Sequence, residues 1–152
     1  MQILSVVELL GSGIVAGVLF SITLAILPTL LTLPADRYTQ VHQLINRNLD
    51  RAMPLIVPAS AAIGLVLAFI APTAGARTLF AVATALLIGV GLVSSTLNVP
   101  INRWLARLDP NALPAEWQDP RPRWRKWHYV RYTFATLALI ANAAAVVSLW
   151  SL

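Results

Sequence analysis

The sequence contains no cysteine, and only 11% of its 152 residues are charged. Without cysteine, the chain has no disulfide framework and no thiolate metal site. A soluble domain carries about 25% charged residues, because its surface must face water. This chain has too few charges to cover a globule, and 58% of it is hydrophobic, with a mean hydropathy of +0.73. We therefore expect one all-α transmembrane domain over residues 1–152.

Four apolar stretches are long enough to cross a bilayer. A membrane-spanning helix needs about 20 largely apolar residues, and such stretches lie at about residues 3–33, 53–71, 78–99 and 129–150. Residues 34–52 repeat apolar side chains at helical spacing and predict an amphipathic helix. Residues 109–123 contain four prolines and predict irregular backbone. The predicted fold is a membrane four-helix bundle with an amphipathic helical loop between helices 1 and 2.

Small residues recur in the first and third stretches. Gly11, Gly13 and Gly17 lie in the first, and Gly89 and Gly91 lie in the third. Residues without bulky side chains let membrane helices approach closely. We expect helix–helix contacts at these positions.

Glu8 is the one charged side chain in the first stretch. An ionisable residue at membrane depth indicates a functional site, whereas a carboxylate near the end of a span can face the interface. Glu8 lies about two turns from the start of the predicted helix. We favour the interfacial carboxylate, near the outer face.

Basic residues gather in two of the three connections. Loop 34–52 carries three arginines and loop 100–128 carries five arginines and a lysine, whereas the connection between them has only Arg77. The positive-inside rule places loops 1 and 3 in the cytoplasm and both termini outside. A membrane face thus explains the net charge of +5, and we predict no nucleic-acid partner. Ten arginines against one lysine are typical of a GC-rich bacterial genome, so we expect an integral protein of the bacterial inner membrane.

Polar residues that can support chemistry are few. His42 and Asn46 are four residues apart and share one face of the predicted amphipathic helix. Taken alone, this pair is typical of an interfacial helix with a solvated polar side.

Asn98 and Asn102 flank Pro100 at the end of the third stretch. Pro100 cannot donate a hydrogen bond to the carbonyl of Thr96, so the helix should kink or end there. The asparagine amides then either bond the freed carbonyl or point into a bundle cavity, where they would orient the oxygen atoms of a substrate. The spacing alone leaves both alternatives open.

His128 and Arg131 are three residues apart at the start of the fourth stretch. A histidine titrates near neutral pH and can act as a base. An arginine one turn into a span must be paired, face a polar cavity or extend to phosphate headgroups. Trp124, Trp127 and Tyr129 nearby are typical of an interfacial aromatic belt.

The predicted topology brings all of these polar residues to the cytoplasmic ends of the helices, which favours a shared site. The predicted catalytic residues are His128 and Arg131. The predicted substrate-binding residues are His42, Asn46, Asn98 and Asn102. We predict no metal ligands and no cofactor for this site.

Several motifs occur together in one known family. The first stretch is Gly-rich and ends in a segment containing Pro28, and the next loop contains Gln43 and Asn46. The third stretch ends in an Asn-x-Pro-x-Asn-x-x-Leu element that begins at Asn98, followed by a Trp-containing basic loop and the histidine and arginine described above. Over nearly its whole length the chain resembles the anthrone oxygenase-like family of small four-helix membrane proteins. The Asn-x-Pro-x-Asn element is the most specific part of the resemblance.

The resemblance implies an oxygenase that converts an anthrone to an anthraquinone with molecular oxygen and without an obvious cofactor. Anthrones are flat and apolar, so they partition into bilayers, and their acidic ring methylene forms a delocalised carbanion. His128 would remove the proton, with His42 as the less favoured base. Arg131 and the amides of Asn98 and Asn102 would stabilise the enolate oxygen. The expected partners are the lipid bilayer, an apolar aromatic molecule and molecular oxygen.

Two other functions stay open. His42 and His128 are the only histidines and are predicted on the same side, so haem or a metal ligated by both is an alternative cofactor. The other alternative is a non-enzymatic subunit that binds lipid headgroups through the third loop or takes part in transport. A transporter this small would need a homo-oligomer to supply further helices.

Overall fold

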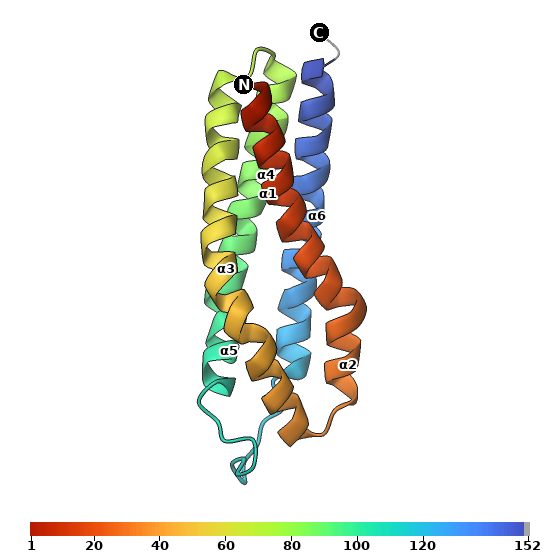
Figure 1. Cartoon of the computed structure of the whole chain (residues 1–152), viewed down its shortest axis with the longest axis vertical. Coiled ribbons are helices and arrows are strands. Elements are labelled where there is room, and N and C mark those ends of the chain that lie inside the picture. Colours follow the sequence, from red (N-terminus) through yellow and green to blue (C-terminus); the bar gives the residue numbers. More distant parts are fainter. Residues whose placement is uncertain (151–152) are drawn as a thin grey trace.

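The chain folds into four long helical rods that run side by side (Figure 1). The computed structural model describes residues 1–150, and within them the predicted all-helical fold is confirmed. The first rod consists of α1 (Gln2–Ser21), η1 (Ile22–Ile26) and α2 (Leu27–Thr32), and the second rod is α3 (Ala35–Ile70). The third rod consists of α4 (Ala74–Val93), η2 (Ser94–Asn98) and α5 (Val99–Leu105), and the fourth rod is α6 (Arg121–Trp150). Each rod is long and apolar enough to cross a membrane, which is compatible with an integral membrane protein.

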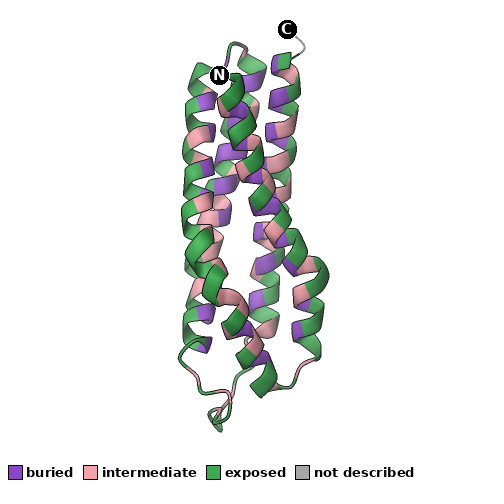
Figure 2. Cartoon of the chain, viewed as in Figure 1, coloured by how far each residue is buried: buried purple, intermediate pink, exposed green. Residues whose placement is uncertain are grey.

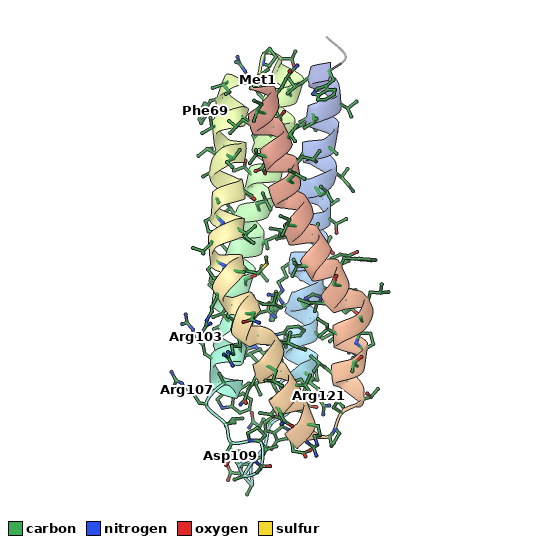
Figure 3. The ribbon with its side chains drawn as sticks, in the orientation of Figure 1. Met1, Phe69, Arg103, Arg107, Asp109 and Arg121 are labelled. Atoms are coloured by element: carbon green, nitrogen blue, oxygen red, sulfur yellow. The ribbon has the colours of Figure 1, made fainter. Side chains whose placement is uncertain are left out.

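The two ends of the bundle differ in what they carry. The N-terminus, the last turn of α6 and the α3–α4 turn lie at one end, which we call the terminal end, and the α2–α3 and α5–α6 connections lie at the opposite loop end (Figure 1). Arg103, Arg107, Asp109 and Arg121 lie at the loop end in Figure 3. The buried residues face inward between the rods along the whole length (Figure 2).

Two helices extend further than the sequence predicts. The amphipathic segment at residues 34–52 is helical as expected, but it is continuous with the second span, so that α3 runs unbroken for 36 residues. The third rod continues through Pro100 to Leu105, whereas we expected the span to end near Val99. A change of helical pitch explains how this proline is accommodated.

The two π-helical turns each end directly before a helix that begins with a proline at its second position. In η1 and η2 the backbone N–H groups of Leu27 and Val99 donate to the carbonyls of Ile22 and Ser94, five residues back. A proline within an α-helix has no N–H to donate, and its ring clashes with the carbonyl four residues back. The wider π turn changes the backbone hydrogen-bonding pattern directly before each proline, so the rods continue through Pro28 and Pro100.

The predicted contacts at small residues are realised at some glycines and not at others. A Cβ on Gly11 would meet the side chain of Ser60, with its Cβ 3.3 Å away, and a Cβ on Gly89 would lie 2.8 Å from the ring of Phe134. A Cβ on Gly17 would meet nothing within 4 Å. Gly11 and Gly89 therefore mark the places where α1 approaches α3 and α4 approaches α6.

The expectation for Glu8 is wrong. Its side chain is fully buried, and its Oε1 accepts a hydrogen bond of 2.9 Å from Nδ2 of Asn142 on α6. The helix continues six residues before Glu8 and turns this side chain into the bundle, away from the interface. The position of Glu8 near the start of α1 does not determine the direction in which it faces.

The segment between α5 and α6 is irregular, as its prolines predict, and it is anchored to the loop end. Arg121 donates from Nη1 to the carbonyl of Leu33 at 2.8 Å, and Gln43 donates from Nε2 to the carbonyls of Leu105 and Leu108 at 2.8 and 2.9 Å. These bonds satisfy carbonyls at the ends of α2 and α5 and in the turn after α5, which have no partner within a helix. These bonds therefore hold the connection between α5 and α6 against the loop end of the bundle.

Replacing Gly11 with leucine tests the close approach of α1 and α3. We expect the Gly11→Leu protein to lose about 1–3 kcal/mol of stability, because the added side chain overpacks against Ser60. Gly17→Leu is the matched control, since its position is exposed and open. Thermal unfolding in detergent measures both variants. Equal midpoints for the two would show that the contact at Gly11 is not tight.

Candidate functional site

A cavity of about 250 Å³ lies between the rods in the half of the bundle nearer the loop end. Its walls are mainly apolar, with contributions from α1 and η1, α3, α4 and η2, α5 and α6. The polar lining residues are Asn46, Asp50, Ser94, Ser95, Asn102 and Arg131. An apolar cavity with a few convergent polar groups is the usual form of a small-molecule site, and this one is slightly below the common lower size of about 300 Å³.

Asn102 connects the polar groups on α3 with those on α6. Its Nδ2 donates to Oδ1 of Asp50 at 3.1 Å and, more weakly, to Oδ1 of Asn46 at 3.4 Å. Its Oδ1 accepts a buried bond of 2.9 Å from the indole Nε1 of Trp124. The amide is thus fully used, and its role in the structure is to hold the Asp50 carboxylate at the cavity wall.

The indole of Trp124 lies at the centre of the predicted site residues. It stacks on the ring of His128, with centroids 5.3 Å apart and planes within 4°, and meets the ring of His42 edge-on at 5.7 Å. The guanidinium of Arg131 lies over the same indole, 5.4 Å from its centroid. Trp124 is therefore a buried part of the cluster, and the expectation that it joins an interfacial aromatic belt is wrong. Tyr129 is exposed, as a belt residue would be.

The hydrogen bonds of His128 define its tautomer. Its Nε2 lies 2.8 Å from Oγ1 of Thr23, a hydroxyl whose own hydrogen is donated to the carbonyl of Leu19 at 3.0 Å. Thr23 can therefore only accept, so Nε2 carries the proton, and Nδ1 is left to accept from Nη2 of Arg131 at 3.4 Å. The η1 turn contributes Thr23 and α6 contributes the other two residues, forming a chain from Thr23 through His128 to Arg131.

Arg131 has no carboxylate partner. Among residues 1–150 the ion pairs join Arg37 with Asp36 and Arg121 with Asp119. Arg131 is only 9% exposed, its Nε is buried without a hydrogen-bond acceptor, and it lines the cavity. A guanidinium has five N–H donors and no acceptor, so most of its donors are available to an anion or a polarised oxygen in the cavity.

Five of the six predicted site residues offer no free group to the cavity in this arrangement: Asn102, whose amide is fully used, and the four described next. Asn46 lines the cavity, but its Nδ2 bonds the ring and the backbone carbonyl of His42 at 2.9 and 3.0 Å. His42 lies behind it, and Asn98 is buried with Nδ2 donating to the carbonyl of Trp124 at 3.1 Å. His128 is buried and is not among the lining residues. All four still lie in one connected cluster with Asn102 and Arg131.

Sequence reasoning missed three members of this cluster. Asp50 had a signal, because it follows His42 and Asn46 at the same spacing of four residues and so shares their helix face. Trp124 had the signal of standing four residues before His128. Thr23 had none, since its partner lies 105 positions away in the chain.

The bis-histidine alternative has little support from the geometry. Both His42 and His128 pack against the indole of Trp124, so a haem or metal ligated by both would have to displace that indole. No group of three or more His, Cys, Asp or Glu residues suited to a metal occurs among the residues that the structure describes. An absorption spectrum and elemental analysis of the purified protein remain the direct tests of this alternative.

The fold and the site together define a four-helix bundle of membrane type with a buried cation in the wall of an apolar cavity. The family model for anthrone oxygenase matches residues 42–141, and the chain belongs to this family. The match begins at His42 and includes Asp50, Asn102, Trp124 and Arg131. No curated protein and no solved structure matches the chain.

The bond from Trp124 to Asn102 gives a test of the cluster. We expect Trp124→Phe to cost about 1–3 kcal/mol, because it leaves the buried Oδ1 of Asn102 without a donor. Trp150→Phe is the matched control, since the Trp150 side chain is largely exposed. Chemical unfolding of the two variants compares them. The assignment of Trp124 to the buried cluster fails if its replacement is no more costly than that of Trp150.

Proposed function

We propose that this chain is a membrane oxygenase that oxidises a flat, apolar aromatic substrate with an acidic C–H bond, such as an anthrone, using molecular oxygen. The observation that carries the proposal is the buried guanidinium of Arg131, which forms no ion pair among residues 1–150 and lies in the wall of a mainly apolar cavity. Membership of the anthrone oxygenase family supports the same class of reaction.

Arg131 stabilises the negative charge that develops on the substrate oxygen when the C–H proton leaves. A fixed cation in a site of low dielectric constant interacts with developing charge more strongly than it would in water, and it needs no reorganisation during the reaction. The bond from Arg131 to His128 and the stacking on Trp124 hold the guanidinium in place. His128 acts here as a positioning residue.

Asp50 is the base in this proposal. The sequence favoured His128, but His128 does not line the cavity, and both of its ring nitrogens have partners. Asp50 lines the cavity, Asn102 holds one of its carboxylate oxygens, and no hydrogen bond occupies the other. Asp50 is also exposed, and in this proposal the exposed carboxylate passes the abstracted proton to solvent.

The reaction balances with substrate and oxygen alone. Asp50 takes one methylene proton, and the delocalised anion transfers electrons to oxygen as a C–O bond forms, giving a peroxide that is then protonated. Loss of the second methylene hydrogen as a proton breaks the O–O bond, forms the ring carbonyl and releases water. One substrate and one oxygen molecule thus give one quinone and one water.

In this proposal the substrate reaches the protein through the bilayer, and the loop end of the protein faces the cytoplasm. A flat apolar molecule concentrates in hydrocarbon and reaches the cavity from there. The loop end carries most of the basic residues, so we place it in the cytoplasm by the positive-inside rule.

Removing the charge of Arg131 tests the proposed function. We expect Arg131→Gln to lower kcat/KM for an anthrone by about 10²–10³-fold, because the developing oxyanion loses its fixed cation. Arg125→Gln, an exposed position on the same helix, should keep full activity. Oxygen uptake by the detergent-purified protein measures both. Full turnover by Arg131→Gln would contradict the proposal.

Asp50 and His128 are distinguished by their effects on kcat and KM. Asp50→Asn should lower kcat by about 10²–10⁴-fold with little change in KM, since it removes the proton acceptor alone. His128→Gln should mainly raise KM, because Arg131 loses its anchor, while Asp36→Asn, an exposed carboxylate, serves as control. If Asp50→Asn is active and His128→Gln has no turnover, His128 is the base.

A further inference from the structure

Three buried oxygen atoms without partners lie in the half of the bundle nearer the terminal end. They are Oε2 of Glu8, Oγ1 of Thr84 and Oδ1 of Asn142. The residues are 0%, 4% and 0% exposed, respectively. A buried polar atom without a hydrogen bond costs free energy, so three of them together indicate a component that the protein chain does not itself supply.

Glu8, Thr84 and Asn142 lie on three rods and approach one another near Gly64 on the fourth. Glu8 lies on α1, Thr84 on α4 and Asn142 on α6, and Asn142 already donates to the other oxygen of Glu8 at 2.9 Å. Gly64 on α3 completes the enclosure: a Cβ there would lie 2.6 Å from Oγ1 of Thr84 and 3.4 Å from Oε1 of Glu8. Figure 1 shows α1, α3, α4 and α6 side by side in this half of the bundle.

No charged side chain faces Glu8 from the neighbouring segments of the other three rods. Residues 52–76, 78–102 and 132–150, which form the neighbouring parts of α3, the third rod and α6, contain no Asp, Glu, His, Lys or Arg. Arg77, in the first turns of α4, is bonded through Nε to the carbonyl of Ala71. A carboxylate that is buried in an apolar interior needs a compensating charge or a proton.

We propose that Glu8, Thr84 and Asn142 bind one monovalent cation, supplied either as a proton on Glu8 or as a sodium ion. A proton on Oε2 would remove the uncompensated buried charge of Glu8. A sodium ion would take all three oxygens as ligands, since hard cations are held by carboxylate, amide and hydroxyl oxygens. The single carboxylate and the small number of oxygens do not suit calcium, which takes six to eight ligands.

The cation site is independent of the proposed oxygenase. It lies in the opposite half of the bundle from the cavity, it shares no residue with the cavity lining, and Glu8 and Asn142 fall outside the family match at residues 42–141. Its function is to neutralise Glu8 and to join three rods through one bound charge. Failure of either proposal leaves the other intact.

Thermal unfolding of the whole protein in detergent tests the site. The midpoint is measured at about pH 5 and about pH 9, on either side of neutrality, in sodium chloride and in choline chloride of equal ionic strength. The variants are Glu8→Gln, a neutral isostere, and Glu116→Gln, the same change at an exposed position. The difference between wild type and Glu8→Gln isolates Glu8 from the other titratable groups, which are the same in both proteins.

If the cation is a proton, the wild-type midpoint in choline falls as the pH rises, because the proton bound in the folded state is lost. A difference of 1 kcal/mol corresponds to a shift of about 2–4 °C for a chain of this size. If the cation is sodium, sodium chloride restores the midpoint at high pH. In both cases Glu8→Gln removes the response and Glu116→Gln keeps it. Identical responses of wild type and Glu8→Gln overturn the proposal.

Two further measurements keep the test decisive if Glu8→Gln fails to fold. Infrared spectroscopy of the wild type at low pH should detect a buried carboxylic acid carbonyl that shifts in deuterium oxide. Thr84→Val removes one oxygen without changing charge or shape, and it should reduce the sodium response. A wild type with neither a carboxylic acid band nor a sodium response refutes the site.

Discussion

A buried guanidinium with no carboxylate partner is the feature on which the arrangement of the loop end depends. Hydrocarbon offers no water to bond Arg131, so the protein surrounds it with groups that hold it without neutralising it. The indole of Trp124 supplies a π face and His128 supplies one acceptor nitrogen. Among residues 1–150 Arg131 forms no ion pair, and the Asp50 carboxylate in the same cavity wall is bonded by Asn102, so the guanidinium remains available to a substrate in the cavity.

Two hydrogen-bonded chains meet at the cavity and are linked by a single side chain. One runs from Thr23 through His128 to Arg131, and the other from Trp124 through Asn102 to Asp50. Trp124 stacks on His128 and so joins the two. Such a network sets a cation and a carboxylate at fixed places, which is the pre-organisation that charge stabilisation in a reaction requires. Proline contributes to it, because the π turns before Pro28 and Pro100 carry Thr23 and Asn98.

The sequence predicts the number and place of the helices because hydropathy and the length of a membrane crossing leave few alternatives. It also predicts that the polar residues gather at one end. It cannot predict the π turns, since a proline can equally kink or end a helix, and it cannot predict which face of α1 buries Glu8. The role of His128 depends on Thr23 in a distant segment. The sequence could have predicted Asp50, because Asp50 follows Asn46 at the same spacing of four residues that separates Asn46 from His42.

The central claim, that this cavity binds and stabilises an anionic substrate, is tested most directly by mixing the protein with an anthrone in the absence of oxygen and recording the absorption spectrum. We predict that the wild type produces the spectrum of the anthrone anion near neutral pH, and that Arg131→Gln leaves the substrate neutral. Admission of oxygen should then convert the anion to the quinone. A neutral substrate spectrum with wild type, together with normal oxygen consumption by both proteins, would contradict the account.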